Sequence, residues 1–177
     1  MLNPQQNKKL LQKLSHCLEV FEPYLFEPQG KLDYRMFETR EHLRAVPPDE
    51  CFHAPVPHWG GPWQPCWFKG RYQPSEQLAG RALYLMPRVG GYEAMLWVDG
   101  MPKGTFATKI VVTRHGNHYC DMLCAQADPA RSMDVALEFY AGHPVPGRAP
   151  FEPDGPLGGE DAEAFSFQAQ DILICTK

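Results

Sequence analysis

Short stretches of strand character, separated by turn residues, fill most of this sequence after residue 65. They cover residues 66–72, 81–86, 93–98, 109–113, 119–125, 135–140 and 165–175. Glycines, prolines and short polar segments lie between them, and no segment between them repeats apolar residues at helical spacing. Strands that follow one another without intervening helices usually pair as antiparallel neighbours. The sequence therefore predicts a mainly β fold, built as an antiparallel sandwich.

The first residues predict a single amphipathic helix. Asn3 can cap the first free amides, Pro4 suits the first helical position, and Gln6 can complete a capping box. Apolar residues then recur at helical spacing, at Leu10, Leu11, Leu14, Cys17, Leu18 and Phe21. A one-sided helix of this kind needs a surface to lie on. Prolines at 47 and 48 break the chain further on, so we divide it into a helical arm, residues 1–45, and a β-sandwich domain, residues 46–177.

Charge and hydropathy exclude two classes of partner. The chain has 17 Lys and Arg against 21 Asp and Glu, a net charge of −4, and its basic residues form no run. Nucleic-acid binding needs clustered basic residues, so we expect none here. A membrane helix needs about 18 uninterrupted apolar residues, and no window of the sequence approaches that.

The cysteines and the first residues indicate the compartment. Lys8, Lys9 and Lys13 interrupt every apolar stretch in which a signal peptide would have its core. Without an export signal, the six cysteines are expected to be free thiols in a reducing, cytoplasmic location.

One group of residues suggests a metal site. His118, Cys120 and Cys124 fall on one side of a predicted strand, and all three are zinc-ligand types. Successive same-face residues of a strand lie nearly 7 Å apart, however, which is too far to close a tetrahedron easily. The competing interpretation, two cysteines packed in the core, is therefore favoured. A small enzyme that uses His118 with one of these thiols is a third possibility.

The carboxylates are candidates for acid–base catalysis, but the sequence does not single out a pair. The candidates are Glu93, Asp99, Asp121, Asp134 and Glu138, and the sequence does not fix the separations on which glycoside hydrolysis depends. Asp134 and Glu138 share a strand face, which we interpret as a solvated outer surface. Asp99-Gly100 follows an apolar run and predicts a tight hairpin turn. The sequence contains no Gly-x-Ser-x-Gly elbow, phosphate-binding glycine loop or His-Glu-x-x-His motif.

Tryptophans are the remaining candidates for contact with a ligand. Trp59 and Trp63 flank a Gly-Gly-Pro segment in a loop rich in proline and glycine. An indole can stack on a sugar ring or cross a domain boundary, and it can equally anchor its loop onto the sandwich. Both interpretations stay open for these two residues. Trp67 and Trp97 lie in strand-like runs and are expected to pack in the core.

Several of these pieces, in this order, resemble the N-terminal region of glycoside hydrolase family 38 α-mannosidases of the cytosolic and vacuolar type. The matching segments are the opening helix, Trp59-Gly-Gly-Pro-Trp63, Cys66-Trp-Phe-Lys69, Leu78-Ala-Gly80, Tyr92-Glu-Ala-Met-Leu-Trp-Val-Asp-Gly100, Tyr140-Ala-Gly-His-Pro-Val-Pro-Gly147 and Pro150-Phe-Glu152. The resemblance covers the chain from about residue 8 onward. It implies a jelly-roll sandwich of the galactose-binding-domain type, placed before the catalytic barrel of a zinc-dependent retaining enzyme.

The catalytic part of that family is not matched by this chain. None of the seven histidines is followed two places later by aspartate, as the family's zinc motif requires. The resemblance therefore implies an accessory domain without catalytic residues or cofactor of its own, with zinc in the catalytic domain of the parent enzyme. That domain is the expected partner, and Trp59, Trp63 and Asp99 are the expected contact residues. We favour a chain cut from a longer enzyme; a free-standing carbohydrate-binding module is the alternative.

Overall fold

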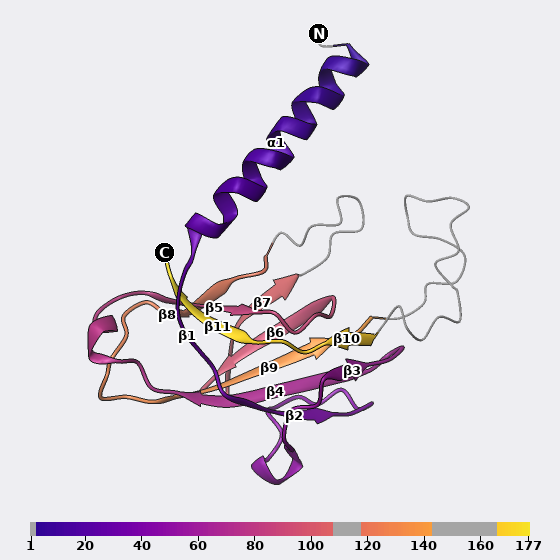
Figure 1. The fold of residues 1–177 in the computed structure, drawn as a ribbon. Helices are drawn as coiled ribbons and strands as arrows, with labels where there is room; N and C mark the ends of the chain where they lie inside the picture. The colour runs from indigo at the N-terminus through magenta and orange to yellow at the C-terminus, as the bar shows by residue number, and fades with distance from the viewer. Residues whose placement is uncertain (1–2, 108–117, 143–165) are drawn as a thin grey trace.

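The computed structural model describes residues 3–107, 118–142 and 166–177. Helix α1, Pro4–Leu25, begins with the predicted capping box: the Asn3 side chain accepts a hydrogen bond from the Gln6 amide, and the Gln6 side chain accepts one from the Asn3 amide. Figure 1 shows α1 projecting away from the rest of the molecule. In the residues that the structure describes, no helix is long and apolar enough to span a membrane.

Two antiparallel sheets form the body of the protein (Figure 1). The four-stranded sheet has the order β1 (Glu27–Lys31), β11 (Ile172–Thr176), β5 (Leu83–Pro87), β8 (Asp121–Cys124). The five-stranded sheet has the order β2 (Tyr34–Glu38), β4 (Pro65–Tyr72), β9 (Met133–Tyr140), β6 (Glu93–Val98), β7 (Met101–Ala107). A separate pair joins β3 (His58–Gly60) to β10 (Ser166–Gln168), and short 3-10 turns occupy Asp49–Cys51 and Glu76–Leu78.

The main core lies between the two sheets, because alternate residues of each strand point inward. On β9, for example, Val135, Leu137 and Phe139 are fully buried, whereas Glu138 and Tyr140 are partly exposed. The same cluster includes inward-facing residues of β5, β6 and β11, namely Leu83, Leu85, Leu96, Ile172 and Ile174. The predicted fold class, a mainly β antiparallel sandwich after a leading helix, is confirmed.

A smaller cluster covers part of the outer face of the five-stranded sheet. Trp67 on β4 and Trp97 on β6 are buried there, with ring centroids 5.9 Å apart, under Phe52 of the preceding loop. Their burial agrees with the packing role predicted for both. Neither indole N–H has a hydrogen-bond partner among the described residues. The segment before β3, which carries Phe52, covers this part of the outer sheet face.

Strands outside the predicted runs are short or irregular. β1 and β2 lie inside the segment assigned from sequence to the helical arm, residues 1–45, and each pairs at the edge of one sheet. β7 contains Pro102 and Gly104, and its side chains are mostly exposed, so its sequence lacks the alternation that marks a strand. The predicted strand at 109–113 and the irregular stretch at 144–159 lie outside the described residues.

Candidate functional site

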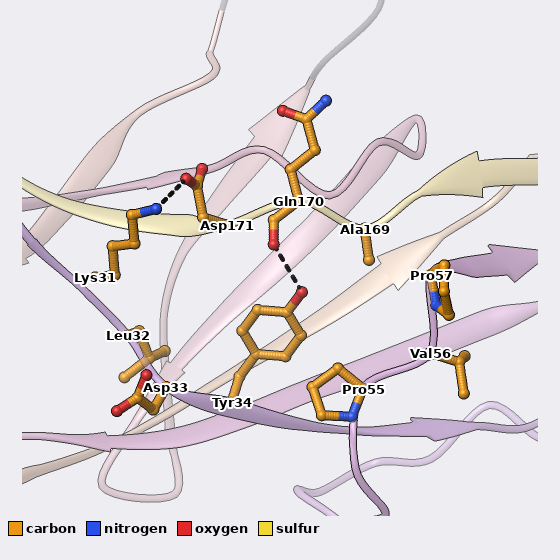
Figure 2. Close-up of a pocket in the computed structure, with 10 residues that line it drawn as sticks. All are labelled: Lys31, Leu32, Asp33, Tyr34, Pro55, Val56, Pro57, Ala169, Gln170 and Asp171. Atoms are coloured by element: carbon orange, nitrogen blue, oxygen red, sulfur yellow. Dashed lines mark hydrogen bonds and ion pairs between the residues drawn. The ribbon is translucent and has the colours of Figure 1, made fainter.

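A cleft opens where the β1–β2 connection approaches the start of β11. Its volume is about 570 Å³, and we call it the Asp171 cleft; its lining residues are Lys31, Leu32, Asp33, Tyr34, Pro55, Val56, Pro57, Ala169, Gln170 and Asp171. Figure 2 shows the Tyr34 ring across its middle, between Leu32 and Pro55. Its size falls in the range of small-molecule sites.

The polar groups of the Asp171 cleft bind one another. The Asp171 carboxylate lies 2.9 Å from Lys31 Nζ and 2.8 Å from Arg88 Nε, which ties β1 to the segment after β5. The Tyr34 hydroxyl donates a hydrogen bond of 3.1 Å to the Gln170 carbonyl (Figure 2). Burial and, secondarily, the Asp171 charge raise the pKa of Tyr34. The Asp171 ion pairs therefore tie together segments of the four-stranded sheet, and the Tyr34 hydrogen bond links that sheet to β2 of the five-stranded sheet.

A second hollow, the Glu138 groove, runs over the outer face of the five-stranded sheet. Its volume is about 550 Å³, and it is lined by His42, Pro65, Glu93, Ala94, Met95, Thr105, Phe106, Ala107, Glu138 and Tyr140. Strand register explains the grouping, because β6 and β9 pair Glu93 with Tyr140 and Met95 with Glu138. Two carboxylates, a phenol and a thioether are thereby placed on one surface.

Burial changes the proton affinity of two groups in the Glu138 groove. Desolvation raises the pKa of Glu138, and the His42 imidazole partly opposes that effect. Burial and, next, the charge of Glu93 raise the pKa of Tyr140. A half-buried carboxylate beside a phenol offers hydrogen-bond acceptors and a donor to a polar ligand.

Trp63 lies at the end of the sheet where the Glu138 groove ends. Its amide donates a 2.8 Å hydrogen bond to the Gly142 carbonyl, and these two residues are each two positions from Pro65 and Tyr140, which line the groove. The Trp63 side chain is 58% exposed, and its φ of 65° is a conformation that few residues other than glycine adopt. The structure thus exposes this predicted contact residue, with its backbone close along the chain to residues that line the Glu138 groove.

Trp59, unlike Trp63, is buried. Its side chain is 2% exposed, and its indole N–H donates a 2.7 Å hydrogen bond to the Val89 carbonyl. Its ring packs against Phe68 and Phe167, each with centroids 5.4 Å away. Of the two roles left open by the sequence, the structure gives Trp59 the anchoring one. Almost none of its surface is accessible to a ligand in this structure.

Asp99 organises the β6–β7 turn. One carboxylate oxygen accepts a 2.6 Å hydrogen bond from Arg131, and the other accepts one of 3.0 Å from the Asp134 amide. The residue has a φ of 51°, as the predicted tight turn requires. Both oxygens therefore hold the turn against the start of β9 and the residue Arg131 just before it.

Of the residues considered for metal, His118 and Cys120 precede β8, and Cys124 is its last residue. His118 Nε2 lies 3.3 Å from Asp121 Oδ2. Burial raises the pKa of Cys120 to about 12 and also raises that of Cys124, so both thiols stay protonated at neutral pH. Among the described residues, no three His, Cys, Asp or Glu side chains are arranged to hold a metal ion. Both cysteines are only partly buried, and Cys124 packs against the main core.

The Glu138 groove could not be located from the sequence. Glu93 and Glu138 were recognised only as carboxylates, and alternation along one strand places Glu138 on an outer face without saying what lies beside it. His42 comes from a segment with no strand or helix pattern. The pairing of β6 with β9 brings Glu93 and Glu138 onto one surface, and the loop after β2 adds His42 to the lining.

Comparisons with known proteins support the fold. No protein-family description and no curated protein matches the chain. A calcium-binding mutant of Bacteroides uniformis β-glucuronidase 2 has a TM-score of 0.52 at 12% identity, over 82% of this chain and 18% of that one. Another B. uniformis β-glucuronidase structure has a TM-score of 0.49 at 11% identity, over 82% of this chain and 17% of that one. A chain described as a β-galactosidase from Bacteroides fragilis has a TM-score of 0.43 at 9% identity, over 85% and 23%.

The sandwich is similar in fold to part of a glycoside hydrolase. Among these three structures only the β-glucuronidase 2 mutant exceeds a TM-score of 0.5, and at 12% identity its likeness concerns fold alone. The chain spans about a fifth of the length of these enzymes. The activity of the whole enzymes is therefore carried over to this chain only as a proposal.

Proposed function

We propose that this chain is a non-catalytic accessory domain of a glycoside hydrolase, whose role is to brace the catalytic domain. The observation that carries this proposal is the likeness of 82% of the chain to an 18% portion of a β-glucuronidase. A fold that recurs as a minor part of a larger glycosidase fits a supporting role better than an independent active site. The expected partner is the catalytic domain of the parent enzyme.

The sequence resemblance favours a family 38 α-mannosidase as that parent. In such an enzyme, zinc would belong to the catalytic domain, and this chain would need no cofactor. A cytoplasmic location fits the resemblance to cytosolic and vacuolar members. Trp63 is the candidate contact across the domain boundary, because its large indole is exposed at the end of the five-stranded sheet.

Carbohydrate binding is the second candidate function, and one arrangement favours it. Trp63 is exposed two residues before Pro65, which lines the Glu138 groove, and in the groove Glu93 and Glu138 offer carboxylate oxygens. Sugar hydroxyls can donate to such oxygens while the C–H face of the ring stacks on an indole. The groove volume of about 550 Å³ suits a small saccharide.

Titration with sugars separates the two functions. The full chain, labelled with ¹⁵N, is titrated with mannose, galactose and their oligomers while amide chemical shifts are recorded by NMR. A bracing domain is expected to show no saturable shift at millimolar sugar. Saturable shifts at Trp63 and Glu138, lost in Trp63→Ala but kept in Tyr24→Ala, would favour carbohydrate binding instead. Tyr24 is the matched control because its ring is 83% exposed on α1, in a different part of the molecule.

A further inference from the structure

The outer face of the five-stranded sheet is covered in one part and open in another. Phe52 packs with Trp67 and Trp97 in the covered part, and the Glu138 groove lies on the same face. Strand register places Glu138 of β9 opposite Trp67 of β4 on one side and opposite Met95 of β6 on the other, so the groove adjoins the covered pair. This open part of the sheet face is available to a second molecule.

The Glu138 groove carries negative charge that its own lining does not balance. Glu93 and Glu138 line it, and its described lining residues include no lysine or arginine. Within the described part of the chain, no hydrogen-bond donor and no ion-pair partner contacts the Glu138 carboxylate. Desolvation raises the pKa of Glu138, and the His42 imidazole only partly opposes this effect. A half-buried carboxylate without a partner is unfavourable, and a cation placed beside it would offset that cost.

Carboxylates elsewhere on the same face have a cation of this chain beside them. Asp134 lies on β9 four residues before Glu138, and its carboxylate is 2.7 Å from Arg71 Nε. The Asp49 carboxylate lies 2.5 Å from Lys69 Nζ. Asp134 and Glu138 share a strand face, yet of these two only Asp134 has a basic partner among the described residues. The cation that complements Glu138 is therefore one that the described part of the chain does not supply.

The arrangement of the two glutamates indicates which cation fits. Glu93 pairs with Tyr140 and Glu138 pairs with Met95, so the two glutamates are diagonal neighbours across β6 and β9. Diagonal neighbours on one face lie about 7–8 Å apart, within reach of one long side chain. A guanidinium has five N–H donors around a plane and can bond two carboxylates, whereas an ammonium acts as a point charge. A guanidinium also stacks on aromatic rings, and Tyr140 lines the groove.

An uncharged sugar complements the Glu138 groove less well than a guanidinium does. Sugar hydroxyls can donate to both carboxylates, but the sugar would displace water from two negative charges without neutralising either. A guanidinium supplies comparable donors together with the opposite charge, so Coulomb attraction adds to the hydrogen bonds. Charge complementarity therefore favours an arginine side chain as the occupant.

We propose that the Glu138 groove receives an arginine side chain of a partner protein, with its guanidinium bonded to Glu93 and Glu138. Naming the catalytic domain of a glycoside hydrolase as that partner rests on the proposed function, whereas guanidinium binding by the groove does not. Because the groove is open to solvent, the attraction is screened by salt, and binding is expected to weaken as the ionic strength rises.

A guanidinium probe tests the groove in the full chain. The ¹⁵N-labelled chain is titrated at low ionic strength with the peptide acetyl-Gly-Arg-Gly-amide while amide chemical shifts are recorded by NMR. Saturable shifts are expected at residues 93–95 and 138–140, with a Kd in the millimolar range. The same peptide with citrulline in place of arginine is the matched probe, because it keeps the shape of the side chain and loses the charge. It is expected to cause no saturable shift in the groove.

Charge-removing variants locate the binding. Glu138→Gln and Glu93→Gln are each expected to raise the Kd of the arginine peptide by about threefold or more, and the double variant to abolish saturable binding. Glu27→Gln is the matched control, since it makes the same charge change on β1 of the other sheet and should leave the Kd unchanged. Burial disfavours the charged form of Glu138, so glutamine there is expected to keep the fold, which the amide spectrum verifies.

Three results would overturn the proposal: no saturable shift in the groove with the arginine peptide, equal binding of the citrulline peptide, or unchanged binding by the double variant. An equal Kd for a lysine peptide would overturn the choice of a guanidinium. Saturable shifts in the groove with a sugar and none with the arginine peptide would assign the groove to carbohydrate instead. The accessory function fails separately, because glycoside turnover by the purified chain would overturn it while leaving a guanidinium site in place.

Discussion

Replacing Trp59 with alanine is expected to lower the free energy of unfolding by about 3–5 kcal/mol, the cost typical of removing a buried large aromatic residue. The indole is 2% exposed between Phe68 and Phe167, and its N–H bonds to the Val89 carbonyl. Truncation would leave a cavity and an unpaired carbonyl at once. Urea unfolding followed by circular dichroism measures the change.

Trp63→Ala is the control for this prediction, because it removes the same side chain four residues later. Trp63 is 58% exposed, so its replacement is expected to change the free energy of unfolding by about 0.5 kcal/mol or less. Equal losses in both variants would show that the two indoles do not differ in burial. A small loss in Trp59→Ala alone would remove Trp59 from the core.

Gly70→Ala is expected to destabilise the protein by about 1–3 kcal/mol, the range typical of overpacking. A Cβ at residue 70 would meet the backbone carbonyl oxygen of Asp33 and come within 3.0 Å of the Leu32 side chain. Because residues 32 and 33 connect β1 to β2, relieving the clash must move the segment that joins the two sheets. Thermal unfolding measured by calorimetry reports this loss.

Gly30→Ala, on β1 of the other sheet, provides the comparison for Gly70→Ala. No atom lies within 4 Å of a Cβ built at Gly30. The free energy of unfolding is therefore expected to stay within about 0.5 kcal/mol of wild type. If Gly70→Ala were as mild as Gly30→Ala, the close approach of the β1–β2 connection to β4 would be wrong.

Regular elements of this fold could be predicted because they carry their pattern locally. Asn3, Pro4 and Gln6 mark the start of α1, and β6 is a short apolar run that ends at the turn residues Asp99 and Gly100. β1, β3 and β7 have no such pattern: they are short, or interrupted by proline and glycine, and pairing with neighbours holds them in place. Their existence depends on tertiary contacts that no local stretch encodes.

The candidate site also depends on contacts between residues that are distant in the sequence. Trp59 and Trp63 flank one short motif, yet one is buried and the other exposed. The difference arises because β3 pairs with β10, more than 100 residues away, and turns Trp59 toward the core. The grouping of Glu93 with Glu138 likewise follows from strand register. The sequence identifies residues that are candidates for ligand contact. Which of them lie together in the fold could not be predicted from it.

The central claim is that this sandwich serves as a scaffold while bond cleavage takes place in another domain. The most direct measurement is to incubate the purified chain with chromogenic α-mannosides, β-glucuronides and β-galactosides, with and without added zinc. The expected result is release of chromophore at the uncatalysed rate with every substrate. Turnover that disappears when one ionisable side chain is changed, for example in Glu138→Gln or His118→Ala, would contradict the claim.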